Sequence, residues 1–363
     1  MKVAFHTDQL WFSAPGGIGT YVRELARALR AMNGGPELAT FQVGAGDGTA
    51  DEVVTGTIRS VYPRWDLTGR PALPFASDVV HATNHAAIPP AARGAGLVVT
   101  VHDLAFDVCP EAFPPMWRWL YRAGVRAAAR RADLILVPSL ATADDLEDRH
   151  GVGPERIRVT PLAASLPTTS LDVDEVLGRL GIARPYVLCP ATLEPRKNQV
   201  RLIRAYRQTV PDVPHTLVLT GPQGWGADAI VAEIARTGPG TIVRTGLLAP
   251  EDLDAVLRGA DAVAYVSTYE GFGLPVIEAM QRGVPVLGST TAAVAETAGD
   301  AALLVNPVDV AAIAEGLARV LTDRMVHDDL MEKGRSRAAG YSWEATAHAT
   351  LDAYRDAVAS ARA

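Results

Sequence analysis

Cysteine is scarce in this chain, and long apolar runs do not occur in it. The 363 residues include two cysteines, Cys109 and Cys189, and each is followed by a proline. Two such cysteines do not suggest a disulfide framework or a cysteine-bound metal cluster. No run of about 18 consecutive apolar residues is present, so the sequence predicts no membrane-spanning helix. The default expectation is a cytoplasmic protein in a reducing compartment.

Basic residues are also fewer than acidic residues. Lysine and arginine number 34 against 41 acidic residues, and the formal net charge is −7. A nucleic-acid-binding domain has a basic footprint instead, so we expect no nucleic-acid partner. A small anionic ligand in a local pocket is compatible with this charge. The first residues, MKVAFHTDQLWF, lack the apolar core of a signal peptide and predict a first strand.

The length and the apolar pattern predict two domains. A chain of 363 residues exceeds the usual single core. Short apolar runs such as KVAF and YVLCPA alternate with segments of helical spacing, which predicts an α/β fold with parallel sheets. The proline- and serine-rich stretch near residues 164–174 predicts a linker between two Rossmann-like domains. In the second domain we expect helices at roughly 197–209, 226–236, 250–258, 275–282 and 309–322.

The stretch TYEGFGLPVIEAM places two glutamates on either side of a glycine loop. Pro275 disfavours a continuous helix but suits the first helical position. We therefore expect Glu270 to end a loop and Glu278 to lie one turn inside a helix. The loop amides then face an anion near the positive end of the helix dipole, at Gly271, Phe272, Gly273 and Leu274. A phosphate with hydroxyl-bearing groups at both ends fits this arrangement, as in a sugar nucleotide.

The stretch ATLEPRKNQV places two cations after the first strand of the second half. Arg196 and Lys197 are expected where a helix begins, although cations prefer the other end of a helix dipole. Two cations at this end suggest an anion between them, as in a pyrophosphate clamp. The alternative is a solvated surface pair.

Two motifs of the first half also follow strands, where ligands of open parallel sheets bind. Gly16 and Gly17 stand between the first strand and the first helix, and such glycines let the backbone approach a phosphate or a sugar. The alternative is a tight turn. His102 follows the strand LVVTV, where it can hydrogen-bond a sugar hydroxyl or move a proton. The alternative is a buried histidine satisfied by the backbone.

Two acidic motifs are expected to have no metal-binding role. Asp172 and Asp174 spell the D-x-D pattern of metal-dependent sugar transferases, but they stand just before a helix, which either of them could cap. The stretch EDLDAVL at 251–257 repeats the spelling inside an expected helix. We predict no metal site.

The stretch PMWRWLYRAGVRAAARR predicts a basic helix face with interleaved aromatic residues. Such a face suits contact with anionic lipid or with a phosphorylated acceptor. The alternative, which we favour, is a solvated face whose aromatic residues pack inward. The arginines recur at four-residue steps, at Arg118, Arg122, Arg126 and Arg130.

Together, the motifs EGFGLPVIEAM, LEPRKN, GGIGTYVREL and VHDL, with the ending YSWEATAHATLDAYRDA, resemble the retaining glycosyltransferase family four. The resemblance covers nearly the whole chain, in the family's order. It implies the GT-B fold, in which two Rossmann-like parallel-sheet domains face a central cleft. The acceptor-side domain would comprise residues 1–165 with a C-terminal helix at 345–363, and the nucleotide-sugar domain residues 175–344.

The resemblance also implies roles for the candidate residues. Glu270 would bind hydroxyls of the transferred sugar and Glu278 the ribose hydroxyls, while Arg196 and Lys197 would stabilise the pyrophosphate. His102 would contact the sugar at the reaction centre. The remaining donor contacts would come from the backbone of Gly16, Gly17, Gly271, Phe272, Gly273 and Leu274. Some members have an extra arginine before the Pro-Arg-Lys segment, where this chain has Pro190-Ala191-Thr192.

The expected function is therefore hexose transfer from a nucleotide-diphospho-sugar, with retention and without a metal or other cofactor. GDP-mannose is the first choice of donor, and the acceptor is a glycan or a lipid-linked glycan. Glu270 acting as a covalent nucleophile is a less favoured mechanism. Three alternatives stay open: a UDP-sugar donor such as UDP-glucose, a non-catalytic sugar-nucleotide-binding protein, and a nicotinamide dehydrogenase. The last lacks its G-x-G-x-x-G fingerprint. If the basic face contacts lipid, the protein works at the inner face of the membrane.

Overall fold

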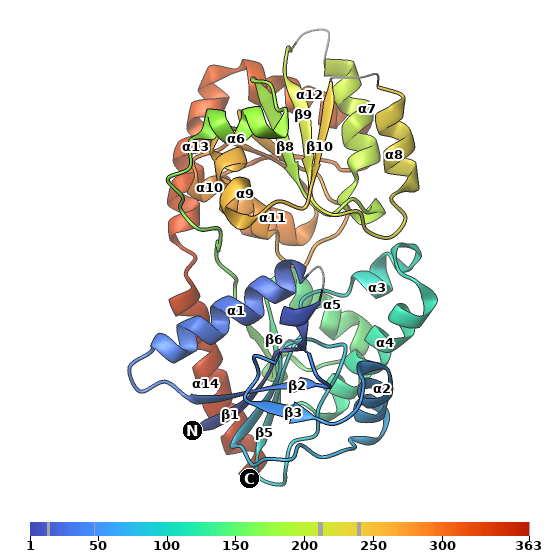
Figure 1. Ribbon diagram of the computed structural model, residues 1–363, viewed down its shortest axis with the longest axis vertical. Helices are drawn as coiled ribbons and strands as arrows, with labels where there is room; N and C mark the ends of the chain where they lie inside the picture. Colours follow the sequence, from blue (N-terminus) through green and yellow to red (C-terminus); the bar gives the residue numbers. More distant parts are fainter. Residues whose placement is uncertain (13–14, 47, 210–212, 238–240, 363) are drawn as a thin grey trace. The chain divides into compact units, whose positions relative to one another are not determined.

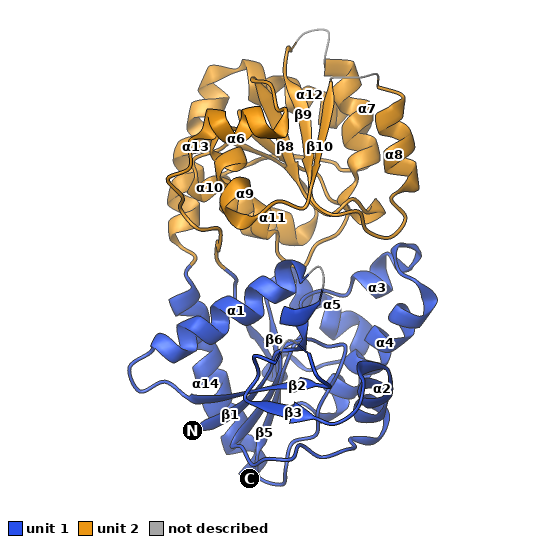
Figure 2. Ribbon diagram, viewed as in Figure 1, with its two compact units in different colours: residues 1–162, 342–363 blue, residues 163–341 orange. Residues whose placement is uncertain are grey.

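The computed structural model describes residues 1–12, 15–46, 48–209, 213–237 and 241–362 (Figure 1). The chain divides into two compact units, residues 1–162 with 342–363 and residues 163–341 (Figure 2). Each unit has its own parallel sheet and its own hydrophobic core. The predicted α/β class with two Rossmann-like parallel sheets is confirmed. Residues 164–174, expected as a linker, are part of the second unit.

The first unit is built on a parallel sheet with the strand order β3-β2-β1-β4-β5-β6-β7. The strands are β1 (Lys2–His6), β2 (Glu37–Val43), β3 (Glu52–Val54), β4 (Val79–Ala82), β5 (Gly96–Thr100), β6 (Leu134–Val137) and β7 (Ile157–Val159). The helices are α1 (Gly16–Ala31), α2 (Ile58–Thr68), α3 (Ala105–Val108), α4 (Pro115–Arg131), α5 (Leu140–His150) and α14 (Trp343–Arg362). Short 3₁₀ turns are η1 (Asp8–Trp11), η2 (Pro110–Ala112) and η3 (Pro154–Arg156).

The last helix of the chain, α14, packs on the first unit beside α1 and against β5 (Figure 1). Gly96 of β5 allows this close approach, because a Cβ there would lie 2.8 Å from the backbone of Ala357. Polar contacts add to the packing, since the Tyr354 hydroxyl lies 2.7 Å from Nδ1 of the buried His81. The C-terminal segment therefore contributes to the core of the first unit.

The second unit is built on a parallel sheet with the strand order β10-β9-β8-β11-β12-β13. The strands are β8 (Tyr186–Pro190), β9 (Thr216–Thr220), β10 (Ile242–Gly246), β11 (Ala262–Tyr265), β12 (Val286–Ser289) and β13 (Leu303–Val305). The helices are α6 (Val173–Leu180), α7 (Gln199–Thr209), α8 (Asp228–Ala235), α9 (Pro250–Arg258), α10 (Leu274–Gln281), α11 (Ala292–Ala298), α12 (Val310–Thr322) and α13 (Arg324–Ala339). One 3₁₀ turn, η4 (Pro195–Lys197), follows β8.

The strand order of each sheet fixes where a ligand is expected. In the second unit β8 and β11 are neighbours, and the chain leaves them toward opposite edges of the sheet. In the first unit β1 and β4 have the same relation. Ligands of open α/β sheets bind at such switch points, beyond the carboxyl ends of the two strands. Arg196 and Lys197 follow β8, and Glu270 follows β11.

Several local predictions can be compared with the structure. Asp172 caps α6, because its Oδ1 accepts a hydrogen bond from the Glu175 amide at 2.9 Å. Helix α10 begins at Leu274, so Pro275 is its second residue and the predicted start was one residue late. Strands β3 and β7 were not predicted; each has three residues and lies at an edge of the sheet. Among the described residues, none of the helices combines the length and apolar character that crossing a bilayer requires.

Candidate active site

The switch point of the second unit brings two predicted motifs together. The Lys197 Nζ donates to both carboxylate oxygens of Glu270, at 2.7 and 2.9 Å. The Arg196 Nη1 donates to Glu270 Oε2 at 2.9 Å. The three side chains come from η4 and from the loop between β11 and α10, which are adjacent because β8 and β11 pair. The predicted cation pair is therefore bound to the first glutamate of the predicted glycine loop.

Further contacts fix the two cations. The Arg196 Nη2 donates to Glu194 Oε1 at 2.9 Å, and its Nη1 donates to the Tyr269 carbonyl at 3.0 Å. The Lys197 Nζ lies 3.0 Å from the Tyr265 hydroxyl. The two cationic side chains are only 13% and 12% exposed. A solvated surface pair, the alternative interpretation of the sequence, does not describe them.

The charge state of Glu270 follows from these contacts. Burial by itself would raise its pKa, but the nearby charges of Arg196 and Lys197 outweigh burial and lower the pKa to about 2. Glu270 is thus ionised throughout the physiological pH range. Together, Glu270 and Glu194 balance the two cations in formal charge.

Asn198 holds the cation turn in place, and the sequence analysis did not single it out. It is the one non-glycine residue with positive φ among the described residues, at 64°. Asparagine tolerates this left-handed conformation better than most residues. Its Nδ2 donates to the Val266 carbonyl at 2.9 Å and to the Pro307 carbonyl at 2.7 Å. Because Val266 directly follows β11, Asn198 ties the turn after β8 to the neighbouring strand.

The glycine loop leads directly from Glu270 into α10. Gly273 has φ of 107° at the N-cap, a conformation that L side chains rarely adopt. Phe272 anchors the loop, since its carbonyl accepts from Thr297 Oγ1 at 2.8 Å. The first amides of a helix have no intrahelical partner, and this applies at the start of α10. The loop is nearly buried and comprises Gly271, Phe272, Gly273 and Leu274.

Glu278 lies in α10 and has a different environment from Glu270. Ser165 Oγ lies 3.4 Å from its Oε1. Burial raises the pKa of Glu278 to about 7, although Arg282 and Ser165 act in the opposite direction. Glu278 is therefore partly protonated near neutral pH, whereas Glu270 is not.

Ser165 reaches Glu278 because its own segment, which leads into α6, is held against α9 and against Arg282 at the end of α10. The Arg282 Nη2 donates to the Leu166 carbonyl at 2.7 Å, and its Nε donates to Asp254 Oδ1 at 3.0 Å. Asp254 is fully buried and also accepts from the Thr169 hydroxyl at 3.0 Å. This network could not be found from sequence spacing, because its members are up to 117 positions apart.

In the first unit, His102 is oriented by a backbone hydrogen bond. Its Nε2 lies 2.8 Å from the Thr83 carbonyl, which directly follows β4. A carbonyl only accepts, so Nε2 carries the proton and Nδ1 of the neutral ring is an acceptor. Burial lowers the pKa of His102, although Thr83 and Asp103 act in the opposite direction. The ring also packs edge-on against Tyr21, with centroids 4.8 Å apart.

The other candidates of the first unit, Gly16 and Gly17, are the exposed first residues of α1. Gly16 has φ of 59°, and a Cβ there would meet no atom within 4 Å. The backbone conformation, rather than crowding, favours glycine at this position. Ser13 and Ala14, which stand shortly before these glycines in the sequence, lie outside the described residues.

The basic helix face fits only in part the favoured interpretation, a solvated face whose aromatic residues pack inward. Trp119 and Met116 of α4 are 50% and 65% exposed, so the aromatic residues do not all pack inward. Arg122 Nε donates to Asp107 Oδ1 at 2.5 Å and is therefore not simply solvated. Arg118 is half-buried, while Arg126 and Arg130 are exposed.

Two acidic residues of the stretch at 251–257 form ion pairs with arginines of the second unit. Asp252 pairs with Arg179 at 2.6 Å, and Asp254 pairs with Arg258 at 2.9 Å. Among the described residues, no group of three or more His, Cys, Asp or Glu side chains could hold a metal ion.

Two family models match the chain in succession. The model described as glycosyltransferase family 4 matches residues 15–166, and the model described as glycosyl transferases group 1 matches residues 179–337. The first match contains Gly16, Gly17 and His102. The second contains the cation pair and both glutamates.

Three curated relatives are similar over most of their length. O-antigen chain mannosyltransferase B of Escherichia coli is 33% identical over 266 residues, 71% of this chain and 70% of the relative. An MMP alpha-(1->4)-mannosyltransferase of Mycolicibacterium hassiacum is 30% identical, covering 74% and 67%. A D-inositol 3-phosphate glycosyltransferase of Frankia alni is 31% identical, covering 95% and 96%.

Solved structures agree on the fold. An Anabaena protein, HepE, solved in complex with UDP and glucose, matches 97% of this chain and 99% of its own with a TM-score of 0.76 and 20% identity. Sucrose-phosphate synthase from Thermosynechococcus elongatus matches 99% and 100% with a TM-score of 0.74 and 22% identity. With these matches, the chain has the GT-B fold and is a glycosyltransferase that belongs to glycosyltransferase family 4.

Proposed function

We propose that this enzyme transfers a hexose from a nucleotide-diphospho-sugar to a glycan or lipid-linked acceptor, with retention of configuration and without a metal ion. The convergence of Arg196, Lys197 and Glu270 at the switch point of the second unit gives the strongest support. We further propose that residues 175–344 bind the donor. Residues 1–165 with 345–363 would then bind the acceptor.

In the proposed reaction, Arg196 and Lys197 bind the donor pyrophosphate. As the sugar–phosphate bond breaks, negative charge grows on the leaving phosphate. Cations that are already fixed stabilise such charge without reorganisation. Glu270, Glu194 and Tyr265 fix them before the donor arrives. The loop amides of Phe272, Gly273 and Leu274 supply additional hydrogen-bond donors.

Retention follows if the acceptor hydroxyl attacks the sugar from the face that the phosphate leaves. The new carbon–oxygen bond forms as the bond to the phosphate oxygen breaks, and a phosphate oxygen takes the hydroxyl proton. Glu270 would bind sugar hydroxyls with the lone pairs that the cations do not use. A carboxylate held by two cations, with a pKa of about 2, is a weak nucleophile, which disfavours the covalent route.

Glu278 is assigned to the ribose. An ionised carboxylate accepts hydrogen bonds from two neighbouring hydroxyls, and Glu278 lies within the helix that begins at the phosphate loop. Its raised pKa means that a ligand with hydroxyl donors must draw it into the ionised form. Nucleotide binding is then coupled to proton release.

GDP-mannose is our first choice of donor. Relatives with 30–33% identity carry the name mannosyltransferase. The alternative is a UDP-sugar such as UDP-glucose, supported by the HepE structure with UDP and glucose at 20% identity. The O-antigen relative supports a glycan acceptor.

In the first unit we propose that His102 contacts the sugar at the reaction centre through Nδ1, because Nε2 is committed to Thr83. Gly16 and Gly17 would close over the donor at the exposed start of α1. Peripheral contact with the inner face of the membrane is proposed for the arginines of α4, at Arg118, Arg122, Arg126 and Arg130.

The test is donor turnover with EDTA present. Purified protein is incubated with GDP-mannose or UDP-glucose and with a lipid and glycan extract of bacterial envelopes, and nucleotide release and glycan mass are measured. We expect GDP release and a mass increase of one hexose. Release of UDP alone would reassign the donor. Turnover that stops with EDTA and returns with a divalent ion would contradict the metal-free mechanism.

A further inference from the structure

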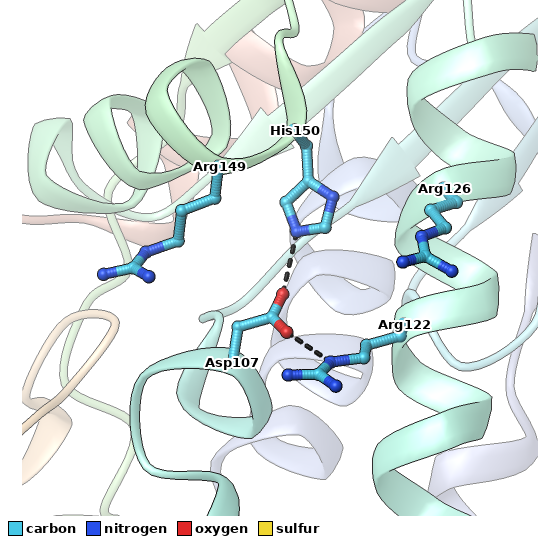
Figure 3. Close-up of a pocket in the computed structure, with 5 residues that line it drawn as sticks. All are labelled: Asp107, Arg122, Arg126, Arg149 and His150. Carbon is cyan, nitrogen blue, oxygen red and sulfur yellow. Dashed lines mark hydrogen bonds and ion pairs between the residues drawn. The ribbon is translucent and has the colours of Figure 1, made fainter.

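A second cationic site lies on the first unit, where α3, α4 and α5 meet. A polar cavity of about 390 Å³ is lined there by Asp107 of α3, Arg122 and Arg126 of α4, and Arg149 and His150 of α5. Figure 3 shows Asp107 between His150 and Arg122, with Arg126 on the side of α4 and Arg149 extending away from them. None of these residues belongs to the donor site proposed above.

Asp107 is the fixed centre of this cavity. Its Oδ1 accepts from Arg122 Nε at 2.5 Å, and its Oδ2 accepts from His150 Nε2 at 2.9 Å. The His150 side chain is only 9% exposed, so the pair is held in a nearly buried position. The carboxylate thus uses both oxygens to orient a guanidinium and an imidazole, and the remaining cations are not neutralised by it.

The cavity has more cationic than anionic groups. Among the described residues, Arg126 makes no hydrogen bond or ion pair, and Arg122 makes none with its two terminal nitrogens. In Figure 3, Arg126 extends from α4 toward the His150–Asp107 pair, and Arg149 lies on the other side of that pair. Asp145 holds Arg149 through its Nε at 2.9 Å. Two arginines of α4 therefore lie beside one carboxylate, Asp107, while Arg149 is paired with Asp145.

We propose that this cavity binds a phosphoryl group. Guanidinium groups bind phosphate oxygens through paired hydrogen bonds, and an arginine oriented in advance by a carboxylate loses less freedom on binding. The terminal nitrogens of Arg122 and the guanidinium of Arg126 would supply the donors, with Arg149 adding charge at the rim.

Two sources could present this group, a soluble phosphorylated compound or a lipid headgroup. Trp119 is half-exposed one helical turn before Arg122, and Met116 is exposed beside it. Apolar residues next to cations suit the boundary between headgroups and acyl chains. The phosphoryl group is the shared chemistry, and the test separates the sources.

The test uses calorimetric titration with inorganic phosphate, and co-sedimentation with vesicles of phosphatidylglycerol or of phosphatidylcholine. Arg126→Ala/Arg149→Ala alters the cavity. Arg23→Ala/Arg93→Ala is the matched control, because it removes two exposed arginines of the same unit outside the cavity. All of the proteins compared, including the one with an unaltered cavity, also carry Lys197→Ala, so that the donor site does not compete for phosphate. The test therefore stays valid even if the proposed donor site is wrong.

We expect the cavity variant to lose about tenfold or more in binding to phosphate or to phosphatidylglycerol vesicles, and the control to stay within about twofold. A loss with phosphate identifies a soluble ligand, and a loss with vesicles alone identifies a headgroup. Arg126→Lys/Arg149→Lys should show a smaller loss, because lysine keeps the charge without the paired geometry.

Both altered side chains lie at the surface, so thermal midpoints should match those of the control. Equal losses in the cavity and control variants would overturn the proposal, since they would show an effect of net charge alone. Failure of the unaltered cavity to bind either probe would also overturn it.

Discussion

Glu270 and Glu278 belong to one loop-and-helix segment, yet their carboxyl groups have opposite electrostatic environments. The cations Arg196 and Lys197 lower the pKa of Glu270 to about 2. Burial raises the pKa of Glu278 to about 7. One carboxylate is permanently charged and fixes the two cations that we propose bind the leaving phosphate. The other can gain or lose a proton at neutral pH.

The two glutamates therefore do not form a paired acid–base arrangement, despite their regular spacing in the motif. Both residues are glutamates of one short motif, but different side chains contact their carboxyl groups. The turn after β8 supplies the partners of Glu270, whereas the segment before α6 supplies Ser165 to Glu278. We therefore expect changes at the two positions to affect different measurements.

The largest expected effect is at the cation pair. Lys197→Ala should lower kcat by about 10²–10³-fold, because one preorganised donor to the leaving phosphate is lost. Circular dichroism should show an intact fold. Arg204→Ala is the control, since it removes a cation of α7 that pairs with Glu233 instead. Near-normal turnover of Lys197→Ala would remove the basis of the proposed clamp.

The two glutamates should separate catalysis from binding. Glu270→Gln should lower kcat about a hundredfold while free nucleotide binds as well or better, because the cations lose their internal counter-ion. Glu278→Gln should weaken nucleotide binding about 10–100-fold, the range for hydrogen bonds to a charged group, and leave kcat at saturation within about threefold. If both variants changed the same kinetic parameter, the division of roles would be wrong.

The stability of the two variants should differ in sign. Glu270 has a lowered pKa, so its ion pairs stabilise the fold above the unfolded pKa near 4.5, and this stability is lost as pH falls toward 2. Glu278 has a raised pKa, so it destabilises the fold as pH rises from about 4.5 to 7.

At about pH 8 we therefore expect Glu270→Gln to lower the free energy of unfolding by about 3 kcal/mol, as when one partner of a buried pair is removed. Glu278→Gln should raise it. Chemical denaturation at several pH values measures both, and a shift of the same sign would contradict the assigned environments.

Nucleotide affinity should depend on pH through Glu278. Ribose hydroxyls favour the ionised carboxyl group, so affinity should rise with pH up to about 7 and level off above it, by at most about tenfold per pH unit. The nucleotide's own phosphate titrates in the same range. Calorimetric titration of wild type and Glu278→Gln separates the contribution of Glu278 to this pH dependence from that of the nucleotide. Identical pH profiles of the two proteins would exclude a contribution of Glu278.

The smallest expected effect is at Ser165. Its hydrogen bond to Glu278 is long, at 3.4 Å. Ser165→Ala should raise the pKa of Glu278 slightly and weaken nucleotide binding about twofold, within the usual range for a weak hydrogen bond. Thr169→Ala, which affects the Asp254 network instead, serves as its neighbour control. A larger loss in Thr169→Ala would mean that segment position, not the Ser165 hydroxyl, supports Glu278.

Much of the fold could be predicted from the sequence because apolar runs and helical spacing repeat clearly along the chain. The strands β1, β5 and β8, predicted from KVAF, LVVTV and YVLCPA, and helices such as α9 and α12 lie close to their predicted positions. The exceptions are informative, since β3 and β7 are edge strands of three residues with few apolar side chains to reveal them.

The site was only partly predictable. Arg196, Lys197 and Glu270 stood out by residue type and turn position, but their direct contact depends on the pairing of β8 with β11, which chain order does not reveal. The Asp107–Arg122–His150 contact joins three helices for the same reason. Asn198 offered one signal, because asparagine adopts the left-handed conformation more readily than most residues and such a residue often ends a helical turn, as it does after η4.

The most direct test of the central claim is thermal unfolding with GDP and with UDP, each with EDTA, for wild type and Lys197→Ala. A ligand at about a hundred times its dissociation constant adds roughly 2.7 kcal/mol, a shift of several degrees for a protein of this size. We expect one of the two nucleotides to raise the unfolding midpoint of wild type despite EDTA, and Lys197→Ala to lose most of that shift. A shift that requires a divalent ion, or one that Lys197→Ala retains in full, would contradict a metal-free nucleotide site built on Arg196, Lys197 and Glu270.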